Sequence, residues 1–160
     1  MQKILRLPEA SASGTAATDV VLISQAEFLA DPARYCAGGA RTGVRVAPAD
    51  RVEDLAPQLA HVDLVAIEFP GPGEGRGYTY ARLLRQRHGF RGEVRAVGPA
   101  VKQDLLFFMV RCGFDAFELA PGQNLTEARQ ALHRFTLAYQ PAVPRATVRE
   151  PRFTAAHDPI

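Results

Sequence analysis

The sequence predicts an α/β domain built from five strand–helix units. Short apolar runs recur along the chain, each is followed by a segment with helical periodicity, and Gly, Pro or Asn residues separate the segments. Alternating strands and helices imply a parallel sheet covered by helices. With 160 residues, of which 47% are hydrophobic and 22% charged, the chain is long enough for one such domain and too short for two of ordinary size.

The stretch 63–78 organises this pattern. Residues 64–67 form a short apolar run typical of a strand buried on both faces, and Pro70 ends it. A loop with four glycines follows, and an amphipathic helix begins directly after it. This order places backbone N–H groups and a helix N-terminus at the carboxyl end of a strand, where open α/β sheets bind ligands and where anions bind well.

The first two units precede this stretch, with expected strands at 20–23 and 43–48. Ser24 and Asp50 stand at the expected N-cap positions of the two helices, and each has a glutamate three residues later, which is the capping-box pattern. Pro57 lies inside the second helical segment, so we expect that helix to be short or kinked.

The helix after the glycine loop has an apolar stripe that includes Ala81 and Leu84, and we expect Arg82 and Arg85 to face water. Two further units follow, with strands at 92–98 and 115–119. The helix between them is apolar nearly all round, which indicates a buried helix or an interface. Gly113 is its expected C′ residue and Asn124 the expected cap of the last helix.

These elements define the expected domain boundaries. Residues 1–19 are expected to form an N-terminal arm or linker, 20–140 a single α/β domain and 141–160 a flexible tail. Five units favour a flavodoxin-like, doubly wound parallel sheet with helices on both faces. Half of a β/α barrel, closed by dimerisation, is the alternative.

Composition indicates which kinds of partner and which cellular compartment to expect. The 19 Lys and Arg residues and 17 Asp and Glu residues give a net charge of +2 without clustering, which argues against nucleic acid. Cys36 and Cys112 are far apart and the histidines lack ligand spacing, so we expect no metal site and no disulfide framework. No apolar run approaches a membrane span and no leader pattern opens the chain, so we expect a cytoplasmic protein.

Two resemblances follow from the motifs. The last three units resemble those of receiver domains, with Glu68 near the usual phospho-acceptor, but Ala120-Pro121 stands where a lysine is expected, and we reject phosphotransfer. The second resemblance is carried by Gly75-Arg76-Gly77-Tyr78, by 92–98 and by the run from Arg111 to Phe117. These blocks resemble a bacterial domain-of-unknown-function family described as oxidoreductases involved in sulfite reduction and encoded beside assimilatory sulfite reductase.

The second resemblance covers about residues 43 to 140 and implies a pathway rather than a chemistry. It implies an accessory protein of sulfate and sulfite reduction, with sulfite reductase or another enzyme of the pathway as partner; a homodimer is also open. An oxidoreductase that binds flavin or nicotinamide is one alternative, and a receiver-like interaction module is the other. The sequence departs from the family in 71–75, which lacks the usual basic and aromatic residues, and in the reversed pair Gln103-Asp104.

The glycine loop is the candidate ligand site. Its backbone N–H groups and one guanidinium can meet a sulfate-like, sulfite or phosphate group. In the alternative, the glycines only permit a tight loop and Arg76 pairs with Glu68 or Glu74. The candidate ligand-binding residues are Gly75, Arg76, Gly77, Tyr78 and Gln103.

Two residues are candidates for catalysis and three for partner binding. Glu68 is a candidate acid or base in an apolar setting, or else caps a helix or pairs with Arg76. Cys112 is a candidate redox thiol beside Arg111, or else a small buried hydrophobe. The candidate partner-binding residues are Leu106, Phe107 and Val110; the alternative is that they belong to the core.

Overall fold

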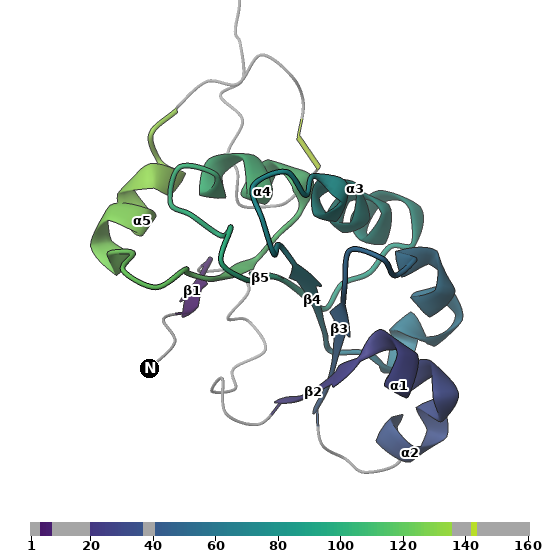
Figure 1. Ribbon diagram of the computed structural model, residues 1–160. Coiled ribbons are helices and arrows are strands. Elements are labelled where there is room, and N and C mark those ends of the chain that lie inside the picture. Colours follow the sequence, from purple (N-terminus) through teal and green to yellow (C-terminus); the bar gives the residue numbers. More distant parts are fainter. Residues whose placement is uncertain (1–3, 8–19, 37–40, 136–141, 144–160) are drawn as a thin grey trace, which may run out of the picture.

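The computed structural model describes residues 4–7, 20–36, 41–135 and 142–143. In these residues six strands form one sheet in the order β1-β6-β5-β4-β3-β2 (Figure 1). Five of them run parallel, so the prediction of a mostly parallel α/β sheet is confirmed. The parallel strands are β2 (Val20–Ser24), β3 (Arg41–Val46), β4 (Leu64–Glu68), β5 (Glu93–Val97) and β6 (Ala116–Glu118).

The helical connections are less regular than the sequence suggests. The first is split at Asp31, and the second is a 3-10 helix that contains Pro57, whose missing N–H disfavours an α-helix. The third changes from α to π at Leu83. The segments are α1 (Gln25–Ala30), α2 (Pro32–Cys36), η2 (Val52–His61), α3 (Arg76–Arg82), η3 (Leu83–Arg87), α4 (Leu106–Cys112) and α5 (Leu125–Leu132).

Local caps agree with the sequence at three of four positions. Ser24 accepts the N–H of Glu27, Asn124 caps α5, and Gly113 adopts the left-handed conformation with φ of 108°. Asp50 is the exception. Its carboxylate accepts the N–H of Ala47 at 2.7 Å and closes the turn before η2, so the prediction that it caps the helix is wrong.

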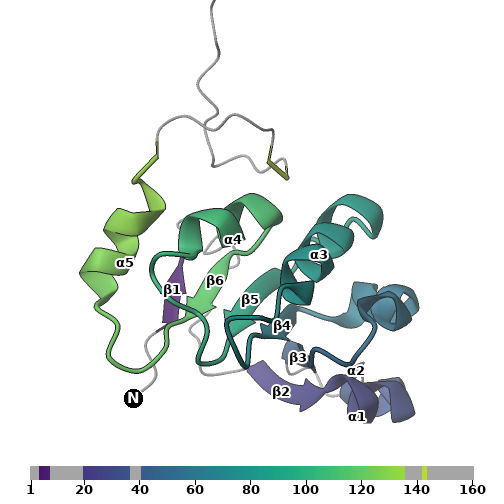
Figure 2. The same cartoon turned by 45° about the horizontal axis from the view of Figure 1, so that its top comes forward.

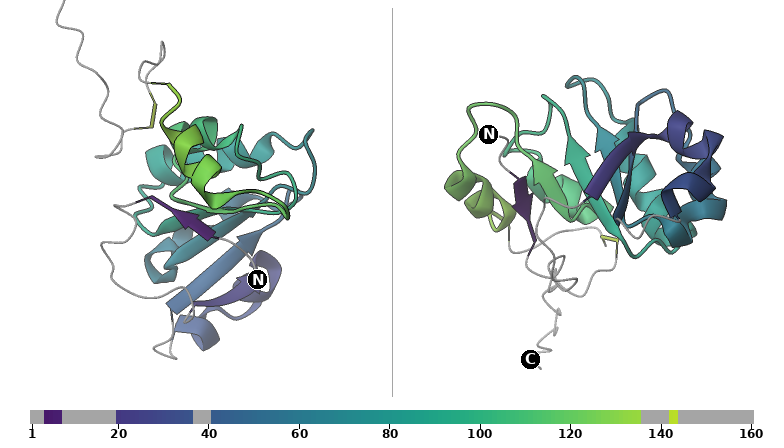
Figure 3. Two further views of the ribbon diagram at one scale, coloured as in Figure 1. Left: turned by 90° about the vertical axis from the view of Figure 1, so that its left-hand side faces the viewer. Right: turned by 90° about the horizontal axis from the view of Figure 1, so that it is seen from below.

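All helices of the described chain lie on one face of the sheet (Figures 2 and 3). The main core cluster joins helix residues to strand side chains that point to one face of the sheet, among them Val44, Val65, Ile67 and Phe117. Side chains on the other face form a separate small cluster of Leu64, Ala66 and Val97, with Val20 and Leu22 packed against it. The expectation of helices on both faces is therefore wrong.

The strand order explains this one-sided layer. Strands β2 to β6 follow one another in the sheet in the order of the chain. When each new strand is added on the same side of the previous one, right-handed crossovers place every connecting helix on the same face of the sheet. In a doubly wound sheet the direction of strand addition reverses once, so helices cover both faces. The doubly wound, flavodoxin-like order is thus not the one observed. Sequential strands with a one-sided helix layer are the features expected of the alternative, half of a β/α barrel.

The sixth strand is β1 (Ile4–Arg6), which comes from the expected N-terminal arm. It pairs antiparallel with β6, and the N–H of Leu7 donates to Asp115 O at 2.9 Å. Most of the expected linker and tail lie outside the described residues. Of the expected tail, Val143 is 4% exposed and its N–H donates to Arg111 O at 3.0 Å, so this residue packs at the end of α4.

Candidate functional site

Phe69 is the hub around which the glycine loop is arranged. Its backbone N–H continues the sheet by donating to Val97 O at 2.8 Å, and its carbonyl accepts the N–H of Ala100 at 3.1 Å. Its ring is fully buried and meets the rings of Tyr78 and Phe114 at centroid distances of 5.3 and 5.7 Å. The carboxyl end of β4 is therefore packed with an aromatic cluster.

Gly77 is required by this packing. A Cβ atom at this position would lie 2.5 Å from the Phe69 ring and 3.0 Å from Ile67. Helix α3 can pass this close to β4 only because Gly77 has no side chain. Gly75 differs, because a Cβ there would meet nothing within 4 Å. Of the two glycines in the candidate motif, one has a clear structural role.

Arg76 binds other parts of the chain. Its Nη1 donates to Pro48 O at 2.9 Å, which ties the start of α3 to the turn after β3. Glu74 accepts the backbone N–H of Arg76 at 3.1 Å and lies 4.0 Å from its Nε. The Glu74 carboxylate thus takes the position at the start of α3 that an external anion would occupy. These contacts favour the structural alternative for the loop, and its ligand role stays a prediction.

The other predicted site residues are dispersed. Glu68 points to the helix-free face and pairs with Arg45 at 3.3 Å, not with Arg76. Gln103 lies in the connection before α4, where its backbone N–H donates to the Gln123 side chain at 3.0 Å. The structure therefore brings Gly77 and Tyr78 together around Phe69 but leaves Glu68 on the other face of the sheet.

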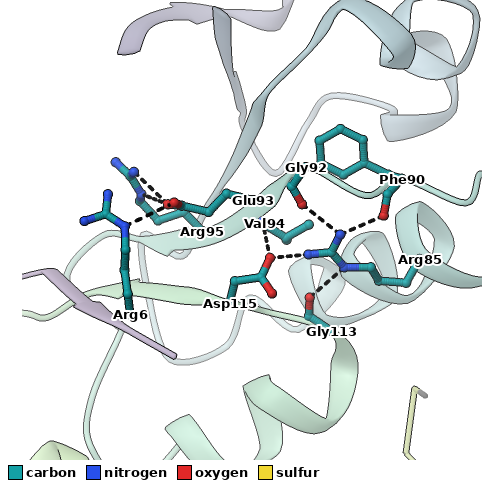
Figure 4. Close-up of polar contacts among 9 residues, drawn as sticks. All are labelled: Arg6, Arg85, Phe90, Gly92, Glu93, Val94, Arg95, Gly113 and Asp115. Carbon is teal, nitrogen blue, oxygen red and sulfur yellow. Dashed lines mark hydrogen bonds and ion pairs between the residues drawn. The ribbon is translucent and has the colours of Figure 1, made fainter. Parts of the chain in front are cut away.

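A buried ion pair lies at the opposite, amino-terminal edge of the sheet (Figure 4). Arg85 donates to the Asp115 carboxylate and to three carbonyls, those of Phe90, Gly92 and Gly113, at 2.7, 2.8 and 3.0 Å. The same Asp115 oxygen accepts the N–H of Val94 at 2.8 Å. We call this arrangement the Arg85 clamp, because it joins η3, the loop before β5 and the start of β6.

The Arg85 clamp corrects a prediction. We expected Arg85 to face water, but its side chain is 8% exposed and that of Asp115 is 1% exposed. Burial lowers the pKa of Arg85 to about 10, which still leaves the guanidinium charged at neutral pH. An arginine in the polar part of a helical pattern and an aspartate directly before a strand are the only sequence signals, and neither specifies the pairing.

Cys112 lies at the end of α4 and is partly buried. Burial raises the pKa of its thiol above 9.0, although Arg82 and Arg111 act in the opposite direction. A raised pKa favours the thiol over the reactive thiolate at neutral pH. Burial likewise raises the pKa of the nearby Tyr78 phenol, with smaller contributions from Cys112 and Asp104. The side chain of Cys36 lies outside what the structure describes.

The residues predicted for partner binding divide between core and surface. Leu106 is 0% and Val110 8% exposed within the main core, so the prediction that they contact a partner is wrong. Helical periodicity could not distinguish the buried face of α4 from its exposed face, because this segment is apolar nearly all round. Phe107 is half-buried, whereas Phe108 is 53% exposed.

Phe107, Phe108 and Phe135 form what we call the aromatic surface, on α4 and just beyond α5. The Phe107 ring lies 5.7 Å from that of Phe108 and 5.1 Å from that of Phe135, and the Arg111 guanidinium lies 5.7 Å above it. Phe135 is 52% exposed. In the described residues the large hydrophobic side chains that are more than half exposed are Phe108, Phe135 and Val21 on β2.

The described part of the chain contains no group of three His, Cys, Asp or Glu side chains placed to hold a metal ion. Within the same residues, every helix is too short or too polar to cross a membrane.

Comparison with known families matches residues 43–150 to a bacterial family of proteins of unknown function, DUF934. The chain belongs to this family. The match begins at β3 and includes the glycine loop, the Arg85 clamp and the aromatic surface, so all three are features of the DUF934 part of the chain. No curated protein matches the sequence.

Proposed function

We propose that this DUF934 protein is a cytoplasmic accessory factor of assimilatory sulfate and sulfite reduction, and that it acts by binding an enzyme of that pathway. Sulfite reductase is the first candidate partner. The choice of pathway rests on the sequence resemblance carried by Gly75 to Tyr78 and by Arg111 to Phe117. The mode of action rests on one structural observation, the aromatic surface.

The aromatic surface has the composition of a protein-binding site. Full burial of a phenylalanine side chain that is exposed to water would contribute about 1.5–3 kcal/mol of favourable free energy. Aromatic and arginine side chains are also enriched among the residues that dominate interfaces. Phe108 and Phe135 are each more than half exposed, and the half-buried Phe107 joins them. Arg111 lies over this central ring.

The flavin- or nicotinamide-dependent oxidoreductase has less support. Open α/β sheets bind such cofactors where the strand order reverses, and strands β2 to β6 do not reverse. The start of α3 is occupied by the Glu74 carboxylate, and Phe69 packs against Gly77. The raised pKa of Cys112 gives no support to a reactive thiolate. An absorption spectrum of the purified protein tests this alternative directly, because flavin absorbs in the visible range.

The pathway is tested by growth. A deletion strain should grow poorly with sulfate as the sulfur source and normally with cysteine, and sulfide should restore growth if the affected step lies at or before sulfite reduction. Equal growth of deletion and parent strains on sulfate, sulfite and cysteine would refute the pathway.

The partner surface is tested by binding of purified sulfite reductase to the wild type and to single alanine variants. Phe108→Ala and Phe135→Ala should each weaken binding by about fivefold or more, as expected for an interface residue that contributes over 1 kcal/mol. Val21→Ala is the matched control, because Val21 is 52% exposed on the edge strand β2. Equal effects of all three variants, or no binding by the wild type, would refute this partner at this surface.

A further inference from the structure

The helix-free face of the sheet carries a row of arginines that only the strand register reveals. Successive Cα partners across the sheet share one face. Three arginines in one row alternate with small residues. From β2 to β1 the row is Ser24, Arg45, Ala66, Arg95, Ala116 and Arg6.

The adjacent rows supply carboxylates. Glu93 lies opposite Leu64 in one of them, and Glu68 and Glu118 lie in the other, opposite Val97 and Ile4. Arg45 pairs with Glu68 at 3.3 Å and so has a carboxylate of its own. Among the described residues, the ion pairs of the other two arginines of the row, Arg6 and Arg95, are both with Glu93.

Arg6 and Arg95 share the single carboxylate of Glu93 (Figure 4). Arg6 Nε donates to Oε2 at 3.1 Å, and Arg95 Nε donates to Oε1 at 2.7 Å. This contact cluster of two guanidiniums and one carboxylate has an excess of one positive charge. The Arg95 side chain is only 9% exposed, so this excess charge is held largely away from water.

One donor in this cluster is poorly used. Arg95 Nη2 is buried and forms an ion pair with Glu93 Oε1 at 2.7 Å, but within the described residues it makes no hydrogen bond. A buried guanidinium nitrogen without a hydrogen bond is costly unless a ligand or water completes it. Within the described residues, two guanidiniums that share one carboxylate and a donor without a hydrogen bond therefore occur at the same place.

We propose that Arg6 and Arg95 bind a divalent oxyanion of the sulfate or phosphate type on the helix-free face, beside Glu93. Guanidinium groups suit this ligand because their planar N–H donors match two oxygens of one anion. Alternate strands are roughly 9–10 Å apart, and both side chains bend toward Glu93, so one small anion can reach both groups.

This site is separate from the aromatic surface, and neither proposal requires the other. It also differs from the glycine loop, where Arg76 is 60% exposed and the adjacent anion is the chain's own Glu74. An oxyanion at Arg6 and Arg95 would bridge β1 to β5 across β6 and so hold the N-terminal strand to the parallel sheet.

The test is a titration followed by the arginine Nε–Hε signals in ¹H–¹⁵N NMR spectra, assigned by single substitutions. Sulfate and phosphate are added separately in the low millimolar range, with sodium chloride adjusted to constant ionic strength. The Arg6 and Arg95 signals should shift and saturate with either divalent anion, while chloride alone produces no saturable shift. Comparison of the two arms identifies the preferred anion.

Matched variants separate a site from general electrostatics. Arg6→Gln should raise the dissociation constant by about tenfold or more, because it removes a charge-assisted pair of hydrogen bonds. Arg45→Gln and Arg76→Gln change the net charge by the same amount and should leave it within about twofold. The general stabilising effect of sulfate acts on all variants alike and so does not mimic this pattern.

Three results would overturn the proposal. They are the absence of saturable shifts in the wild type, equal weakening by all three glutamine variants, and shifts that saturate at Arg76 rather than at Arg6 and Arg95. If circular dichroism shows that Arg6→Gln does not fold, Arg95→Lys replaces it. This variant keeps the charge but loses the planar fork, so it should also weaken binding, and unchanged affinity would contradict the proposed contacts.

Discussion

The Arg85 clamp should be among the most expensive polar contacts in the chain to remove. In Arg85→Met, the 1% exposed Asp115 loses its buried counter-ion, and the carbonyls of Phe90, Gly92 and Gly113 each lose a donor. Removal of one partner of a buried ion pair typically destabilises a protein by about 3–5 kcal/mol, whereas exposed pairs contribute about 0–1 kcal/mol. The residual hydrogen bond from Val94 to Asp115 places the expected loss toward the lower end, at about 3 kcal/mol.

The assay is equilibrium urea unfolding of the wild type, Arg85→Met and the control Arg82→Met. Arg82 lies on the same helical segment but is exposed, so its replacement should change the free energy of unfolding by less than about 0.5 kcal/mol. The denaturant slope should stay constant, because the clamp does not change the surface exposed on unfolding. A loss below about 1 kcal/mol for Arg85→Met would mean that the pair behaves as a surface ion pair, and would refute the reasoning.

Two further predictions concern packing and the thiol. Gly77→Ala should lower the free energy of unfolding by about 1–3 kcal/mol, because its Cβ would lie 2.5 Å from the Phe69 ring, whereas Gly75→Ala should be nearly neutral; similar values in thermal or urea unfolding would contradict the proposed close contact. In a Cys36→Ser background, the alkylation rate of Cys112 by iodoacetamide should be slow at neutral pH and still rising above pH 9.0, because burial raises its pKa. A rate that reaches its plateau below that pH would show a lowered pKa instead.

The sequence predicts the elements of this fold better than their arrangement. The apolar run 64–67, the cap at Ser24 and the left-handed Gly113 are local features, and the structure contains all three. Strand order is a long-range property, because a strand–helix–strand unit fixes the handedness of its crossover but not the direction of the next one. The same five units therefore fit a doubly wound sheet and the sequential sheet that is observed.

The sites show the same limit. Gly77 is a candidate in the sequence because it lies in a glycine-rich loop, but the structure shows that a glycine is needed there because the Phe69 ring, just after β4, packs against it. Arg85 has the pattern of a solvated arginine, because helical periodicity cannot reveal that Asp115 lies opposite it. Arg6 and Arg95 are distant in the sequence and meet only through the registers of β1, β6 and β5.

The position of β1 has a consequence for how the chain assembles during synthesis. Strands β2 to β6 emerge from the ribosome in the order in which they pair, so each new strand finds its neighbour already made. Strand β1 is different, because it precedes these strands in the chain while its partner β6 is the last of the described strands to appear. Strand β1 therefore cannot take its place until β6 has been made, and its pairing marks the completion of the described sheet.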